Sequence, residues 1–237
     1  MKNKRGFTLA EVLITIGMLG IIAAVTLPAL RSDIDKNTWA TGLKTNMAIL
    51  NTAFNQMMTE EDVSDIRDTN LWTQLVNNTS VEPTNNDYKK ALDKYFKIDK
   101  VESNFPAKAH KLSGSIYTKP STRFYIGNST TLNINFKKDS LFSACTNSQE
   151  FCHPAAEIVL DVNGDKGPNT MGKDMFLLLL GENGRIYPAG SDAVYNYNSK
   201  YPKWDSEAGC QDKKPKDVDG TACAGRVVDE GYKINYK

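Results

Sequence analysis

An apolar run near the N-terminus constrains this chain more than any other feature. Residues 7–30 form a run of 24 residues with a single charged side chain, Glu11. A helix of that length extends about 36 Å, which is enough to cross a hydrocarbon core of about 30 Å. Three positive side chains, Lys2, Lys4 and Arg5, precede the run. Because positive charge stays on the cytoplasmic side, we expect the rest of the chain to face outward.

Three interpretations of this N-terminus compete. An ordinary signal peptide has a shorter apolar core followed by a small-residue cleavage site, and residues 27–29 (Leu-Pro-Ala) are a poor candidate for that site. A plain signal anchor fits the length but leaves Glu11 unexplained, because a carboxylate in a membrane helix costs about 2.5–3.5 kcal/mol. Cleavage after Gly6 explains both features. It leaves Phe7 as a new N-terminus, with Glu11 one helical turn away.

The segment around Gly6 resembles a known processing motif. Residues 5–14 read Arg-Gly-Phe-Thr-Leu-Ala-Glu-Val-Leu-Ile, and this string is similar to the prepilin peptidase motif of type IV pilins and type II secretion pseudopilins. The resemblance implies cleavage by prepilin peptidase between Gly6 and Phe7, followed by methylation of the Phe7 amine. Glu11 matches the glutamate of the family motif.

Two further residues of the run, Gly20 and Pro28, match positions where the helix of this family often carries Gly and Pro. In the family, that stretch can loosen in an assembled filament. Pro28 has no backbone N–H and removes an i→i−4 hydrogen bond, which predicts a kink in the helix. The motif covers about 30 of the 237 residues.

Beyond Arg31 an apolar stripe predicts that the helix continues. The stripe steps by 4, 4, 3, 4 and 3 residues through Trp39, Leu43, Met47, Leu50, Phe54 and Met57. Together with the apolar run it predicts one helix over residues 7–59, roughly 80 Å long. Its second half is expected to pack on a globular domain.

The rest of the chain predicts two short helices and an antiparallel sheet. Residues 60–111 look mostly helical, with two short apolar faces around Trp72 and Leu92 that would cover one edge of the sheet. β-Branched and aromatic residues with turn signals between them predict strands at 122–126, 131–136, 157–162, 174–180 and 185–188. A short strand is expected within 226–236.

These predictions amount to an α+β fold. As is common in pilins, the long N-terminal helix, with a membrane-spanning first half, is expected to pack on the antiparallel sheet of a head domain. Residues 1–6 would be a leader removed by prepilin peptidase and residues 7–30 the transmembrane and filament-core helix. Residues 31–237 would form the pilin-like head domain, including the second half of the helix.

Four cysteines lie in the second half of the chain: Cys145, Cys152, Cys210 and Cys223. They form no CxxC pair, and with two histidines in the chain the usual zinc spacing is missing. Of three pairings, the short separations favour Cys145–Cys152 and Cys210–Cys223. Since the N-terminus argues for export, we expect both disulfides, each contributing about 2–3 kcal/mol in the chain-entropy model. Four reduced thiols are the alternative.

One loop is a candidate calcium site. The candidate ligands are Asp161, Asn163, Asp165 and Asp174. Oxygen-bearing side chains at alternate positions resemble the start of a calcium loop. An EF-hand would need Gly and Glu where this chain has Lys166 and Gly172, so the loop is not an EF-hand. Some pseudopilins similarly place calcium in a loop of the head domain. The alternative is a turn whose side chains cap backbone groups, and no cofactor is required for the expected function.

The sequence offers little for catalysis or nucleic-acid binding. Basic and acidic side chains number 29 and 28, so no global field steers nucleic acid. The sequence holds no Gly-x-Ser-x-Gly, His-x-x-x-His or phosphate loop. His153 beside Cys152 would suggest a thiol nucleophile, but we expect Cys152 to be oxidised. The chain is therefore not expected to be an enzyme.

The resemblance implies a structural subunit of a type IV pilus or a type II secretion pseudopilus, assembled through its N-terminal helix. Its expected partners are prepilin peptidase, other pilin or pseudopilin subunits and the inner-membrane assembly platform. We expect it in the bacterial inner membrane, single-pass with the head outside the cytoplasm, and then in a periplasmic or cell-surface filament. The alternative is a membrane-anchored periplasmic binding module or enzyme with a similar leader.

Overall fold

The structure is a computed structural model. It describes residues 6, 8–77, 83–106, 109–117, 120–127, 130–137, 154–195, 201–207, 209–211 and 219–236. The chain divides into two compact units, Met1–Thr38 and Trp39–Lys237.

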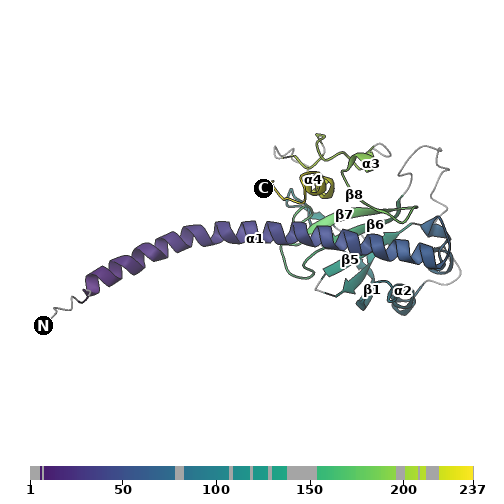
Figure 1. The fold of residues 1–237 in the computed structure, drawn as a ribbon, viewed down its shortest axis with the longest axis horizontal. Coiled ribbons are helices and arrows are strands. Elements are labelled where there is room, and N and C mark those ends of the chain that lie inside the picture. The colour runs from purple at the N-terminus through teal and green to yellow at the C-terminus, as the bar shows by residue number, and fades with distance from the viewer. Residues whose placement is uncertain are drawn as a thin grey trace. The chain divides into compact units, whose positions relative to one another are not determined.

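One helix, α1 (Leu9–Glu60), contributes to both units (Figure 1). In the first unit its large apolar side chains are exposed, from 44% at Val12 to 78% at Leu9. The helix is long and apolar enough to cross a membrane, judged by its length and composition. The predicted helix over residues 7–59 is confirmed to within two residues at its start, and it runs on through Pro28 without ending. The kink at Pro28 stays a prediction.

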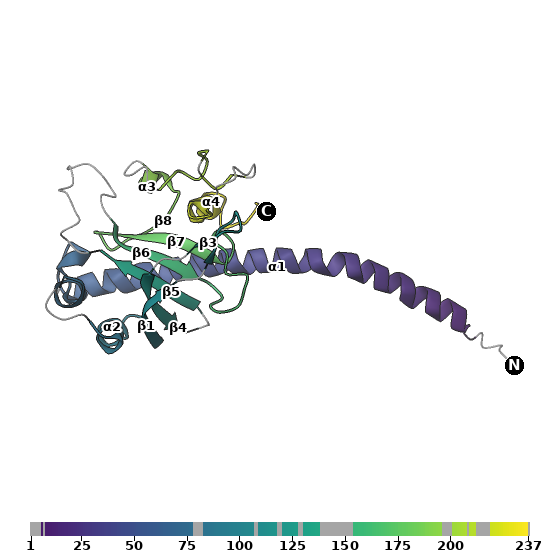
Figure 2. The ribbon, with the colours of Figure 1, turned by 180° about the vertical axis from the view of Figure 1, so that it is seen from behind.

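The second unit contains a six-stranded antiparallel sheet with the strand order β1-β4-β5-β6-β7-β8 (Figures 1 and 2). Its strands are β1 (Ile98–Pro106), β4 (Pro120–Ile126), β5 (Thr130–Phe136), β6 (Pro154–Asp161), β7 (Met175–Gly181) and β8 (Ile186–Pro188). A separate two-stranded sheet pairs β2 (Ala109–His110) with β3 (Ile116–Tyr117). The predicted α+β class is confirmed, and all five internal strands occur close to their predicted bounds.

The inner face of this sheet packs on the second half of α1. Side chains alternate along each strand, so Phe124, Leu132 and Leu160 come to lie on one face, each at most 1% exposed. They join Leu43 and Phe54 of α1 in one core cluster. The apolar stripe predicted along α1 is therefore the surface on which the sheet packs.

The other face of the sheet carries a second, smaller core. Val159, Leu177 and Leu179 point to this face and pack with Met171 and Tyr187. Strands β6 and β7 are consequently buried on both faces along their whole length. This double burial explains why β7 reads as an unbroken apolar run instead of an alternating one.

Five short helices are described in addition to α1. The 3-10 helix η1 (Ile66–Asp68), the π-helix η2 (Leu71–Val76) and α2 (Asn85–Leu92) follow α1, and α3 (Asp192–Tyr195) and α4 (Cys223–Asp229) come later. Figures 1 and 2 show α2 near the β1 edge and α3 and α4 towards the β8 edge. The two short helices predicted around Trp72 and Leu92 occur as η2 and α2. Only α2 lies at the edge strand as predicted, because η2 packs at the end of β5, where Trp72 contacts Phe136.

Two sequence predictions are wrong. Residues 60–111 are not mostly helical, because β1 and β2 occupy 98–106 and 109–110. Charged residues between buried Ile98 and Val101 hid the strand. Residues 226–236 form no strand: the segment begins inside α4 and then has no regular structure. Val227 and Val228 favour strand by propensity, but α4 buries Ala224 and Val227, three residues apart on one helical face.

Helix α4 packs closely on the backbone that follows β8. Gly225 N donates to Ala189 O at 2.8 Å, and a Cβ placed on Gly225 would lie 2.5 Å from the backbone of Gly190 and Ser191. Only Gly allows this approach without a shift of the backbone.

We expect Gly225→Ala to lower the free energy of unfolding by about 1–3 kcal/mol, because overpacking against backbone outweighs the roughly 1 kcal/mol by which Ala favours a helix. Gly127→Ala is the matched control. A Cβ on Gly127 meets no atom within 4 Å, so stability should change by less than about 0.5 kcal/mol. Thermal unfolding of the detergent-solubilised chain measures both. Equal effects would show that the α4 contact is not tight.

Candidate functional site

The first turn of α1 is closed by a reciprocal pair of side chains, Thr8 and Glu11. Thr8 N and Thr8 Oγ1 donate to Glu11 Oε2 at 2.8 and 2.9 Å. In return, Glu11 N donates to Thr8 Oγ1 at 3.2 Å. This is a capping box, which satisfies backbone N–H groups that the first turn of a helix leaves without partners.

The capping box leaves half of the Glu11 carboxylate available. Both donors reach Oε2, and no described residue donates to Oε1. Neither donor carries a charge, so the box supplies hydrogen bonds but no counter-charge. Sequence reasoning found Glu11 but missed Thr8, although the Thr-x-x-Glu spacing was a readable signal of a capping box.

The other residues predicted for processing and bending lie around this turn and further along α1. Gly6 is exposed, with no atom near the position of a Cβ, while Phe7 lies outside the described residues. Gly20 lies within α1, with no atom within 4 Å of a Cβ position. Pro28 is also inside the helix.

Residues 1–27 match the family described as the prokaryotic N-terminal methylation motif. No curated protein and no solved structure matches the chain. The chain carries the prepilin-type signature of type IV pilins and pseudopilins. This signature implies processing by prepilin peptidase and assembly with other pilin subunits, and it points to a structural subunit. The signature and the apolar helix fit an inner-membrane-anchored subunit.

The loop predicted to bind calcium connects β6 to β7 and is braced by its own carboxylates. Asp174, fully buried, accepts from Thr170 N at 2.7 Å and from Asn169 N at 2.8 Å. Asp161, 1% exposed, accepts from Asn163 N at 3.3 Å. These bonds are the backbone capping that the sequence left open as the alternative to a metal.

The electrostatics of the loop reflect this burial. Burial is the main reason that the pKa of Asp161 rises to about 7, and the nearby Asp174 carboxylate adds to the rise. Burial also raises the pKa of Asp174, against the opposing effect of the N–H groups of Thr170 and Asn169. Two buried carboxylates thus lie close together and disfavour each other's charge.

The remaining predicted ligand, Asp165, pairs with an arginine outside the loop. Asp165 Oδ1 lies 3.0 Å from Arg123 Nη2, and its side chain is 74% exposed. Within the described part of the chain, no group of three or more His, Cys, Asp or Glu side chains is arranged to hold a metal ion. Calcium binding by Asp161, Asn163, Asp165 and Asp174 therefore stays a prediction.

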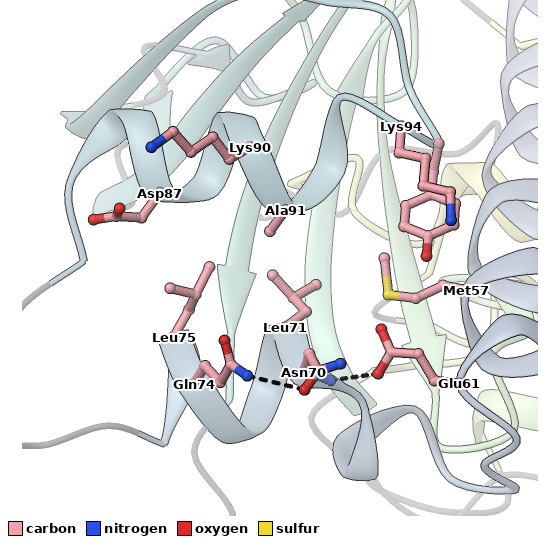
Figure 3. Close-up of a pocket in the computed structure, with 11 residues that line it drawn as sticks. Met57, Glu61, Asn70, Leu71, Gln74, Leu75, Asp87, Lys90, Ala91 and Lys94 are labelled. Carbon is pink, nitrogen blue, oxygen red and sulfur yellow. Dashed lines mark hydrogen bonds between the residues drawn. The ribbon is translucent and has the colours of Figure 1, made fainter.

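The end of α1, η2 and α2 enclose a groove of about 360 Å³ (Figure 3). Leu71 and Leu75 of η2 face Ala91 of α2 across it. Three of its polar residues bond one another: Gln74 Nε2 donates to Asn70 Oδ1 at 3.0 Å, and Asn70 N donates to Glu61 Oε2. The groove therefore has an apolar floor, and part of its polar rim is hydrogen-bonded within the protein.

A salt bridge beside the groove ties the end of α1 to the turn after α2. Lys94 pairs with Glu60, and Tyr95 Oη donates to Glu60 Oε2 at 3.0 Å. The hydrogen bond from Lys94 is the main reason that the pKa of Glu60 falls to about 2. A lowered carboxyl pKa favours the folded state above pH 4.5, and that benefit is lost as the pH falls towards 2.

A disulfide joins Cys210 and Cys223, the pairing that the short separation favoured. Arg226 of α4 is buried beside it and donates from Nη1 to Cys210 O at 2.9 Å. The Arg226 guanidinium also lies 5.1 Å from the centre of the Tyr236 ring. The bridge, the cation and the ring together hold the C-terminal segment. Cys145 and Cys152 lie outside the described residues, so their pairing stays a prediction.

Replacing both cysteines of the observed bridge, Cys210→Ser with Cys223→Ser, should cost about 2–3 kcal/mol of stability, since the bridge closes a loop across 13 residues. Non-reducing peptide mapping of the exported protein should recover the Cys210–Cys223 peptide together with a Cys145–Cys152 peptide. A link between Cys145 and Cys210, or between Cys152 and Cys223, would refute the local pairing.

Proposed function

We propose that this chain is a structural subunit of a type IV pilus or a type II secretion pseudopilus, with no chemistry of its own. The observation that carries the proposal is the methylation motif over residues 1–27, joined to an exposed apolar helix. A helix that is apolar all round needs lipid or other helices around it. Both environments occur in this proposal, first the inner membrane and then the core of a filament.

The proposed life of the subunit begins with trimming on the cytoplasmic side. Prepilin peptidase would cut between Gly6 and Phe7 and methylate the new amine. The head domain would then stand outside the cytoplasm, anchored by the first half of α1. An inner-membrane platform would extract subunits from the membrane pool into a periplasmic or cell-surface filament.

Glu11 is the residue proposed to set the position of each incoming subunit. Trimming leaves a positive amine on Phe7, which a neighbouring subunit would bring to Glu11 in a nearly water-free core. An unpaired charge is costly there, so pairing would dock subunits at one height. The capping box supports this role, because Oε1 accepts no hydrogen bond from a described residue.

The competing function is a membrane-anchored binding module or enzyme that carries a similar leader. It requires neither trimming nor polymerisation. The groove in Figure 3 is one cavity that such a module would offer, but Glu61, Asn70 and Gln74 on its rim already bond one another. We therefore favour the filament subunit.

Intact-mass measurement of the chain from its own membrane separates the two functions. We expect loss of residues 1–6 and the gain of one methyl group on Phe7. The Gly6→Leu variant should keep its leader, because the peptidase no longer finds its glycine. A wild-type chain that retained residues 1–6 would favour the anchored module.

Substitutions at Glu11 test the docking role and separate it from capping. Glu11→Ala removes the charge and the cap, whereas Glu11→Gln removes the charge and keeps an acceptor for Thr8. Neither touches the bond between Gly6 and Phe7. We expect both variants to reach the membrane and to be trimmed normally, yet to lose most of their incorporation into filaments.

Sheared-filament fractions and membrane fractions, compared by immunoblot, provide the measurement. If Glu11→Gln assembled like wild type while Glu11→Ala did not, the carboxylate would serve the cap and not docking. If both variants were trimmed and assembled like wild type, the docking role would be wrong.

A further inference from the structure

We propose that the Arg123 guanidinium is the resident cation of the β6–β7 loop, so that this loop folds without the calcium ion that its sequence suggests. The inference concerns the head domain and is independent of the proposed filament role. It rests on where Arg123 lies and on which atoms already bond the loop carboxylates.

The strand register of the sheet places Arg123 next to the β6–β7 loop. Arg123 of β4 is paired with Asn133 of β5, and the neighbouring β5 residue on that face, Thr131, is paired with Asp161 of β6. Arg123 therefore reaches across β5 towards the end of β6. Its Nη2 lies 3.0 Å from Asp165 Oδ1 and 3.8 Å from Asp161 Oδ2.

The guanidinium is held in place from other sides as well. Arg123 Nη2 donates to Thr131 Oγ1 at 3.2 Å. The guanidinium carbon lies 5.0 Å from the centre of the Tyr125 ring, a cation–π distance. Tyr125 in turn donates from Oη to Glu102 Oε2 at 2.9 Å. Because Arg123 is only 8% exposed, its position is set by these contacts and not by solvent.

Most of the side-chain oxygens that a calcium ion would use already have partners, while Asn163 Oδ1 is buried without a hydrogen-bond partner among the described residues. Calcium takes six to eight oxygens at about 2.3–2.6 Å. Both carboxylate oxygens of Asp174 accept backbone N–H groups, Asp161 Oδ1 accepts Asn163 N, and Asp165 Oδ1 faces Arg123. An ion bound to these carboxylates would sit beside a buried guanidinium that also carries a positive charge, which is unfavourable in a desolvated site.

Access for calcium is not the obstacle. Tyr125, Asn163 and Asp165 line a cavity of about 410 Å³, and the Asp165 side chain is 74% exposed. An ion in solution can therefore reach the loop. A wild-type Tm that does not respond to calcium would therefore reflect the positive charge of Arg123, and not a loop that calcium cannot reach.

The experiment tests whether calcium can replace the Arg123 guanidinium as the cation of the loop. In the wild-type chain in detergent, Tm should agree within about 1 °C between 1 mM CaCl₂ and 1 mM EGTA. Arg123→Met keeps much of the side-chain volume but removes the charge. This variant should melt earlier than wild type in EGTA, and calcium should raise its Tm by about 3 °C or more.

Two matched variants isolate the charge. Arg123→Lys keeps the cation, so it should remain insensitive to calcium. Adding Asp161→Asn to Arg123→Met removes one carboxylate, so the double variant should regain part of the lost Tm in EGTA and lose the calcium response. If Arg123→Met alone does not fold, the double variant is still expected to fold in EGTA, because it lacks the Asp161 charge that Arg123 offsets. A double variant that also failed to fold would contradict the proposal.

A rise of about 3 °C or more in the wild-type Tm with calcium would overturn the proposal, because the loop would then bind the metal with Arg123 in place. The proposal also fails if folded Arg123→Met shows no calcium response. Wild-type insensitivity together with a response confined to Arg123→Met supports it.

Discussion

The structure depends on α1 carrying two hydrophobic patterns in one unbroken helix. In the first unit its apolar side chains are exposed, as Leu19 and Ile21 are at 64% and 70%. In the second unit the apolar residues narrow to one stripe, in which Leu43 and Leu50 are fully buried. A β-sheet with an apolar face needs such a stripe to pack against. The same helix thus provides the foundation of the head fold and the part of the chain that requires lipid or other helices.

Sequence reasoning recovered the parts of the fold that have a strong period or a strong turn signal. The stripe through Leu43 and Phe54 was readable because its period reports one buried helix face, and β5 was readable from its β-branched and aromatic residues and the turn signal before it. Strand β1 was missed because charged residues interrupt its apolar ones. Helix α4 was missed because its conformation depends on the close approach of Gly225 to the backbone of Gly190, a contact that no local pattern encodes.

The candidate sites also differ in whether the local sequence reveals them. Glu11 was predictable, since a lone charge in an apolar run stands out, and Thr8 was equally visible as the partner of a capping box. Arg123 was not, because 38 residues separate it from Asp161 in the sequence. Only the register of β4, β5 and β6 brings the two side chains together. A prediction made from residues 161–174 alone therefore did not include the cation that lies beside them, Arg123.

These two acidic sites differ in how their charge is offset, and the difference bears on assembly. In the head, the loop carboxylates have backbone donors and the Arg123 guanidinium within the same domain. At the start of α1, the donors on Glu11 are a neutral N–H and a hydroxyl, so the carboxylate is hydrogen-bonded while its charge is not offset by a described side chain. Trimming after Gly6 would create the missing positive group at Phe7. The loop carboxylates have a cation within the head, whereas the carboxylate at the helix end has none among the described side chains, and an uncompensated charge is costly in an apolar medium. A positive group brought by a neighbouring subunit would therefore relieve that cost at the helix end.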